Sequence, residues 1–233
     1  MKRTYTFILL VSLVLLALQS PAQVVIPELD EWMSNVELKQ SLEDAINPDV
    51  YTQVDGSPYL SDDFVKGEVM LKNGDKYRGI LRYDMYANEV QFKVREMIYV
   101  IAFPEDVEYL TIGDVRLVYA GCVIDRKPEH SYFEQLADGP CELLVRKQVI
   151  LKDPVPAKPY VEAKPARFEP RKDVYYLKKG DEPVLKIGKK SEVIDFLEEG
   201  DYNIAGYIKK EKINLNQKED LLQLVEYYNK IER

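Results

Sequence analysis

Acidic side chains are the most abundant groups in this chain that could carry out chemistry, because it contains 40 Asp and Glu residues. Two carboxylates that face each other can act as the acid and base of a glycoside hydrolase. Three acidic clusters are visible, Asp62–Asp63, Glu105–Asp106 and Glu198–Glu199, and each lies in a predicted loop or helix end. Charge at such positions is usually solvated. We therefore assign no catalytic residue, and a carboxylate-dependent hydrolase of envelope carbohydrate remains an alternative function.

Metal and nucleophile chemistry is restricted by composition, since the chain has one His and two Cys. These residues cannot form a multi-histidine site, a four-cysteine zinc site or an iron–sulfur cluster. His130 follows the polar stretch 126–129 without a Gly-x-Ser-x-Gly motif, so we predict an exposed turn residue. The sequence also lacks a glycine-rich phosphate loop. We expect no metal site and no cofactor.

A basic strip with a tyrosine beside it is the best binding candidate. In 76–86, Arg78 and Arg82 alternate with Tyr77, Leu81 and Tyr83, which places the two kinds of side chain on opposite faces of a strand. A neighbouring strand can extend the strip. The predicted ligand-binding residues are Arg78, Arg82, Tyr83, Lys93 and Arg95. They could hold an anionic glycan or an acidic protein segment, and the alternative is the solvated face of an antiparallel sheet.

The region 64–152 must position these residues, and its pattern predicts consecutive antiparallel strands. About eight short apolar or alternating segments follow one another with short connections, and no helix-length segment interrupts them. Asn73-Gly74 is the strongest hairpin signal, because both turn positions favour positive φ. We expect a β-meander that forms a curled sheet or a barrel-like roll. If the roll encloses a cavity, the protein could instead carry an apolar ligand.

The remaining segments flank this β-domain. Residues 23–63 form a lead-in with a possible helix in 30–46, and 153–170 contain five prolines, which indicates an extended, semi-rigid connector. Residues 171–233 predict a small hairpin and three helices, at 191–198, 202–213 and after Asn216. Asn216 precedes Glu219 by the spacing of a capping box. The fold class is therefore α+β.

Residues 1–22 have the order of a secretory signal peptide. Lys2 and Arg3 precede the apolar run 7–18, and Ser20 and Ala22 provide small residues for cleavage after Ala22. Twelve apolar residues are too few for a spanning helix, which needs about 20. We expect a secreted or periplasmic protein without a transmembrane anchor after cleavage. Its net charge of -8 disfavours nucleic acid as a partner.

Export makes a disulfide between Cys122 and Cys141 conceivable, because secreted proteins meet an oxidising environment. The predicted strands, however, place the two residues near opposite ends of one strand, about 20 Å apart at ~3.3 Å per residue. A disulfide needs Cα atoms within about 7 Å. The spacing favours two buried thiols and leaves the disulfide as the alternative.

Several tyrosine-rich segments resemble a family of secreted Gram-negative bacterial proteins that has no assigned activity. The resemblance rests on Gly56–Leu60, Leu81–Tyr86, Glu89–Lys93, Tyr175–Lys178 and Asp220–Asn229. It covers about residues 56–230 and implies secretion and a two-part layout, but no catalytic residue. Together with the 17 tyrosines, which suit contact surfaces, it favours a non-enzymatic binding protein. The expected partner is a protein or glycan of the cell envelope.

Overall fold

The structure is a computed structural model, and it describes residues 26–29, 51, 54–157, 159, 162–198 and 203–232. The predicted signal peptide, the possible helix in 30–46 and Glu199 lie outside the described residues.

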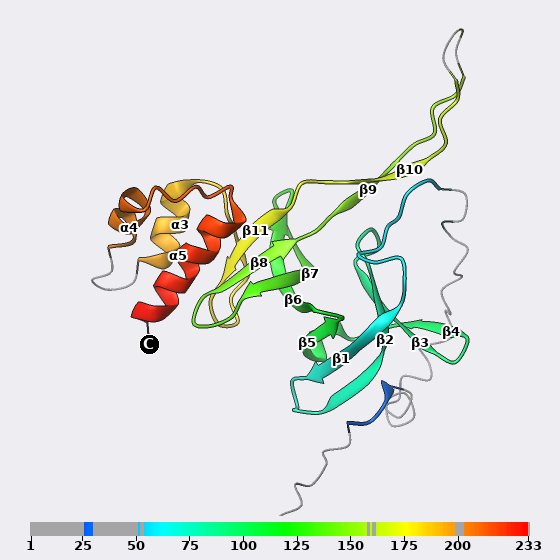
Figure 1. Cartoon of the computed structure of the whole chain (residues 1–233), viewed down its shortest axis with the longest axis horizontal. Coiled ribbons are helices and arrows are strands. Elements are labelled where there is room, and N and C mark those ends of the chain that lie inside the picture. The colour runs from blue at the N-terminus through cyan, green and yellow to red at the C-terminus, as the bar shows by residue number, and fades with distance from the viewer. Residues whose placement is uncertain are drawn as a thin grey trace, which may run out of the picture.

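Ten strands form one antiparallel sheet in the order β12-β11-β8-β7-β6-β5-β1-β2-β3-β4 (Figure 1). Their bounds are β1 Val65–Leu71, β2 Lys76–Asp84, β3 Glu89–Val94, β4 Met97–Val100, β5 Val107–Ile112, β6 Val115–Ile124, β7 Lys127–Ala137, β8 Glu142–Arg146, β11 Val174–Lys178 and β12 Leu185–Lys186. The prediction of an antiparallel sheet in an α+β protein is confirmed. The sheet is not a simple meander, because β1 pairs with both β2 and β5, and it does not close into a barrel.

The β1–β2 turn shows how a local signal leads to a hairpin. Leu71 N–H bonds to Asp75 O at 2.8 Å, and Gly74 N–H bonds back to Leu71 O at 2.9 Å. Gly74 has a φ of 92°, while Asn73 keeps a negative φ. The loop is therefore a turn followed by a glycine bulge, and not the two-residue turn with two positive φ angles that we expected. The Asn73 side chain secures it by accepting the Asp75 N–H at 2.9 Å.

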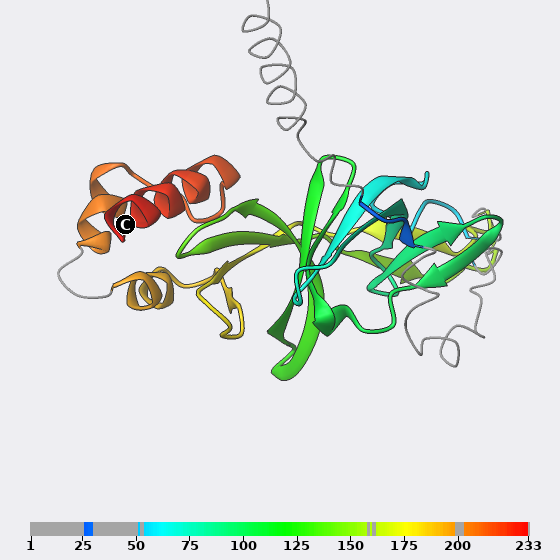
Figure 2. The ribbon, with the colours of Figure 1, turned by 90° about the horizontal axis from the view of Figure 1, so that it is seen from below.

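The long strands β6 and β7 are shared by two curled halves of the sheet (Figures 1 and 2). Because side chains alternate along a strand, each face of this pair enters a different core. Leu117 and Tyr132 pack into the core of β1–β5, whereas Val118 and Phe133 pack into a second core that also contains Val184. One two-stranded unit therefore supports both halves.

In each half of the sheet, isolated hydrogen bonds rather than a strand ladder join elements that are not neighbouring strands. In the first half, Asn88 in the β2–β3 turn accepts the N–H of Tyr132 at 3.1 Å and donates to His130 O at 3.2 Å. Asn88 can do this because it adopts a left-handed backbone with a φ of 59°. In the second half, Val184 N–H donates to Gly121 O at 2.8 Å.

The segment 153–170, which we predicted to be a connector, leaves the sheet and returns. Strand β9 (Val149–Lys152) pairs with β10 (Arg167–Pro170), and the two form a ribbon that projects from the body (Figure 1). The chain can then pair β11 with β8. Phe168 anchors the base of the ribbon, since its ring centre lies 5.1 Å from that of Tyr51 and 5.3 Å from that of Tyr86.

Three helices lie at the end of the sheet near β8 and β11 (Figure 2). They are α3 (Lys190–Leu197), α4 (Ile204–Lys210) and α5 (Lys218–Ile231). Their apolar residues form a third core with Leu143 and Leu177 of the sheet, as the apolar stripe of 221–228 predicts. The capping prediction was wrong, because α5 begins after Gln217 and has no side-chain cap.

Candidate functional site

Arg82 and Tyr83, two of the five predicted binding residues, are held within the fold. The Arg82 guanidinium lies between two rings, 3.6 Å from the centre of Tyr59 and 4.2 Å from that of Phe64. Its Nη2 and Nε donate to Gln91 Oε1 at 2.7 and 3.1 Å. Tyr83 is 3 % exposed and packs in the core of β1–β5. The packing therefore buries Tyr83, whereas the half-buried Arg82 keeps its guanidinium against two rings and Gln91.

Of the other three predicted residues, Arg78 and Lys93 share one sheet face, and a neighbouring acid engages each of them. Arg78 Nε donates to Glu68 Oε1 at 3.1 Å, and Lys93 Nζ lies 3.4 Å from Glu96 Oε2. Arg95 lies in the β3–β4 turn with a φ of 55° and is exposed. The sequence had suggested one continuous basic strip. In the structure, the five residues do not form a continuous basic surface.

Asp84, from the tyrosine-rich segment 81–86, is a buried carboxylate with a structural role. It is 1 % exposed, and Oδ1 accepts the N–H groups of Tyr86 and Ala87, both at 2.9 Å. Burial raises the pKa of Asp84, and burial also raises the pKa of Glu89 on the opposing strand. The Asp84 carboxylate is closed to a substrate, and its two hydrogen bonds fix the β2–β3 turn.

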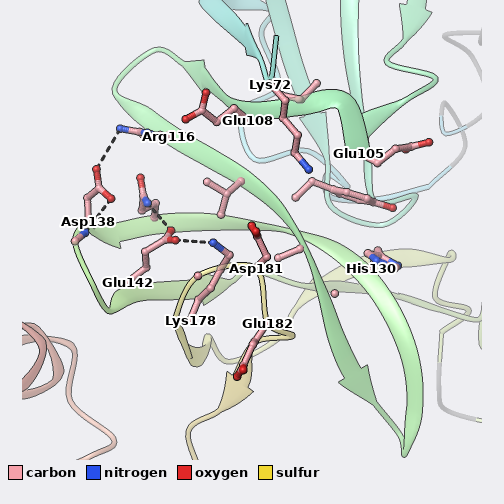
Figure 3. A pocket seen from close by; sticks show the side chains of 18 of the residues that line it. Lys72, Glu105, Glu108, Arg116, His130, Asp138, Glu142, Lys178, Asp181 and Glu182 are labelled. Atoms are coloured by element: carbon pink, nitrogen blue, oxygen red, sulfur yellow. Dashed lines mark hydrogen bonds and ion pairs between the residues drawn. The ribbon is translucent and has the colours of Figure 1, made fainter. Parts of the chain in front are cut away.

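A polar hollow of about 830 Å³ is lined by residues from several strands and turns (Figure 3). It lies where β5 and β6 separate and is bordered by the β7–β8 and β11–β12 turns. Its charged lining residues are Lys72, Glu105, Glu108, Arg116, Asp138, Glu142, Lys178, Asp181 and Glu182. Six are acidic and three are basic, so the hollow carries net negative charge. This lining differs from the apolar cavity that a carrier of apolar ligands requires.

Two of the acids in the hollow are neutralised by its own cations. Lys178 Nζ lies 2.6 Å from Glu142 Oε1, and Gln135 Nε2 donates to the other oxygen of Glu142 at 2.6 Å. Arg116 Nη1 lies 3.9 Å from Asp138 Oδ2. The Arg116 guanidinium also stacks 3.8 Å from the ring centre of Tyr109. These contacts form the fixed floor of the hollow.

Four acids remain at its rim. Glu105 and Glu108 come from the β5 side, and Asp181 and Glu182 come from the β11–β12 turn (Figure 3). All four are exposed, and within the described residues none of them forms an ion pair. Glu105 belongs to an acidic cluster that is visible in the sequence, whereas no local pattern marks the other three acids as site residues. Only the pairing of β11 with β8 brings 181–182 to this place.

His130 also lines the hollow, and its structural setting corrects the predicted turn. It lies within β7 opposite Gly121, because Asp125 and Arg126, both with positive φ, complete a tight turn before it. Its ring stacks on Tyr119, with ring centres 5.6 Å apart. The residue is exposed, as predicted, and it adds an aromatic wall to the hollow.

Both cysteines are free, buried thiols that belong to different cores. Cys122 lies in the core with Phe133, and Cys141 lies in the core of the three helices. Burial raises the pKa of both thiols, that of Cys141 to about 12. Neither environment favours a reactive thiolate.

Comparisons with protein-family models, with curated proteins and with solved structures found no match to this chain. Among the described residues, no helix has the length and apolar character needed to cross a membrane. No group of three or more His, Cys, Asp or Glu side chains in the same residues could hold a metal ion.

Proposed function

We propose that this chain is a non-enzymatic binding protein whose hollow receives a positively charged segment of a partner protein. The observation that carries the proposal is the set of four unpaired carboxylates, Glu105, Glu108, Asp181 and Glu182, around one concave site. Lys72 is the single lining cation without an ion pair in the described residues, so the unpaired charge is strongly negative. Such a field attracts a cationic partner and repels an anionic one.

This proposal replaces the anionic ligand that the basic strip had suggested. Arg78 and Lys93 already have acidic partners, and Arg82 is enclosed by two rings. A second anion at the strip would compete with those contacts. At the hollow, by contrast, the rim carboxylates are exposed and an incoming cation replaces only water.

We further propose that the protein acts after export, in the periplasm or outside the cell. The order of charges and apolar residues in 1–22 supports this location. The described segment 26–29 begins three residues after the expected new N-terminus and docks on the sheet, where Arg78 N–H donates to Pro27 O at 2.9 Å. Mass spectrometry of the exported protein should find Gln23 as the first residue, whereas an intact N-terminus would refute cleavage.

The binding proposal is tested with a defined probe, the peptide acetyl-Val-Lys-Arg-Val-Lys-Val-amide, by calorimetric titration at low and physiological salt. Neutralising the rim acids (E105Q, E108Q, D181N and E182Q together) should weaken binding by at least about tenfold. The matched control neutralises four exposed acids outside the hollow: D63N, D114N, D195N and E226Q. Equal affinity of the rim variant and the control variant for the peptide would refute the proposal.

A further inference from the structure

An open strand edge runs through the hollow. Four consecutive residues of β6, Val118–Gly121, line it. Successive side chains of a strand point to opposite faces, so four in a row can line one cavity only along the backbone edge. The ladder between β5 and β6 ends at the Leu110–Leu117 pair, whereas β7 pairs with the other edge of β6 as far as Ile124. The described part of β6 therefore continues past its neighbour.

The direction of the backbone groups along this edge follows from one hydrogen bond. Val184 N–H donates to Gly121 O, so the carbonyl of Gly121 points away from β7, to the edge of β6 that lines the hollow. In an antiparallel strand, a residue directs its N–H and C=O to the same edge, as does the residue two positions away. The Gly121 N–H and both backbone groups of Tyr119 therefore point into the hollow, and within the described residues no strand pairs with them.

The four rim carboxylates flank the two sides of this edge. Glu105 lies near Tyr119, because its charge raises the pKa of that tyrosine in addition to the larger effect of burial. Asp181 and Glu182 precede Val184, which packs with Val118 and Ala120 on the other face of β6. Figure 3 shows the two acidic groups on either side of the strand.

We propose that the partner segment binds as an added β-strand that pairs with both backbone groups of Tyr119 and with the Gly121 N–H, its basic side chains directed to both faces. A peptide backbone alternates donors and acceptors as this edge does, which a glycan does not. Adjacent Lys or Arg residues on such a strand would point one to each side, toward Glu105 on one face and Asp181 or Glu182 on the other. Backbone pairing supplies affinity and the rim acids select a basic sequence. This inference rests on the proposed function and specifies its binding mode.

Two arms of one experiment test the backbone pairing. The first compares the parent peptide acetyl-Val-Lys-Arg-Val-Lys-Val-amide with two versions that are N-methylated at alternate residues. Methylation removes backbone donors without changing charge, so at least one pattern should lose about tenfold or more in affinity. The second arm compares the affinity of the parent peptide for two variants, G121P, which removes the N–H, and G121A, which keeps it. G121P should bind the peptide more weakly than G121A does. A Cβ at position 121 would lie 3.4 Å from His130 Nε2, so alanine fits.

Hydrogen exchange provides a direct readout that does not depend on a variant's folding. Saturating parent peptide should slow exchange of the Tyr119 and Gly121 amides in the wild-type protein, whereas the amide of exposed Asp195 should not change. If both methylated peptides bind like the parent and exchange is unchanged, strand addition is wrong while the charge-based function stands. If the parent peptide does not bind the wild-type protein at all, both proposals are wrong.

Discussion

Asn229, near the end of α5, brackets the backbone of Cys141 at the start of β8. Its Oδ1 accepts the Cys141 N–H at 2.8 Å, and its Nδ2 donates to the Cys141 carbonyl at 2.8 Å. A second donated bond reaches Asp138 O at 3.3 Å. Gly139 must stay small beneath it, because a Cβ there would lie 2.6 Å from Asn229 Nδ2. This side chain therefore adds a polar link between the helical unit and the sheet to the apolar core that they share.

Replacing Asn229 by alanine should destabilise the protein by about 2–4 kcal/mol, because two buried backbone groups of Cys141 lose their partners. N229D should cost at least as much, since a carboxylate cannot donate to the carbonyls of Cys141 and Asp138. Urea unfolding followed by circular dichroism measures both. K230A, on the exposed side of the same helix, should change stability by no more than about 0.5 kcal/mol. Equal stability of N229A and K230A would show that the hydrogen bonds of Asn229 to Cys141 do not stabilise the fold.

Asn88 makes a similar link between the β2–β3 turn and β7. Its Oδ1 accepts from Tyr83 OH, Ser131 Oγ and the Tyr132 N–H at 3.0–3.1 Å. Because Asn88 has a positive φ, N88G removes the side chain without backbone strain. We expect N88G to cost about 2–3 kcal/mol from the lost contacts alone.

The matched variant N88A separates the backbone contribution from these contacts. It should be less stable than N88G by up to about 1 kcal/mol, because alanine disfavours that φ. Thermal and urea unfolding compare the two. If N88G were as stable as the wild type, the hydrogen bonds from Asn88 to β7 would contribute nothing to the free energy of unfolding.

These two asparagines show what the sequence could and could not predict. Both lie within or next to the tyrosine-rich segments, yet all their partners except Tyr83 are 42–44 or 88–91 residues away. Local alternation correctly predicts strands such as β2 and the glycine of the β1–β2 turn, because each depends on neighbouring residues. The pairing of β1 with β5, and of β11 with β8, depends on contacts between residues far apart in the sequence. The alternation of apolar and polar residues does not predict such contacts.

The candidate site was harder to predict for the same reason. A two-residue alternation places Arg82 on the face opposite Leu81, and the structure agrees. It cannot show that Tyr59 and Phe64, from a segment before β1, enclose the guanidinium. The prolines of 153–170 indicate an extended chain, but they do not distinguish a connector from a returning ribbon. The hollow exists only because the ribbon returns and brings Asp181 and Glu182 beside β6.

Gly79 provides a test of the docked segment 26–29. A Cβ at this glycine would lie 2.3 Å from Leu29 Cδ1, so G79A should displace Leu29 and cost about 1–3 kcal/mol. L29A empties the same space, and alanine at position 79 should then cost much less. The wild type, the two single variants and the double variant form a double-mutant cycle measured by urea unfolding. If G79A costs the same in the wild type and in the L29A background, then Leu29 does not occupy that space.

The thiols of Cys122 and Cys141 should be protected in the folded protein. Burial raises both pKa values, so the reactive thiolate is scarce at pH 8. Ellman's reagent should modify neither residue rapidly under native conditions and both in guanidinium without reductant. The variant C122S provides a one-thiol standard. Absence of labelling after denaturation would instead establish oxidation, and a mass 2 Da below the reduced chain would identify a disulfide.

Asp84 makes a prediction for the pH dependence of stability. Burial raises its pKa in the folded state above the ordinary value, so the folded protein holds this proton more tightly than the unfolded chain does. As the pH rises from the ordinary aspartate range through the raised pKa, the unfolded chain loses its proton first. The contribution of Asp84 to the free energy of unfolding therefore falls across this interval. It is greatest below the ordinary pKa, where both states are protonated.

The variant D84N should remove this part of the pH dependence, because its amide oxygen can still accept the N–H groups of Tyr86 and Ala87 but has no charge to bury. We expect it to be at least as stable as the wild type near pH 7, and its stability relative to the wild type should increase as the pH rises above the ordinary aspartate range. E89Q is the matched comparison, since burial raises the pKa of Glu89 in the same direction. Urea unfolding between pH 3 and 8 measures all three proteins. If the wild type instead gains stability relative to D84N as the pH rises, the folded protein stabilises the Asp84 carboxylate.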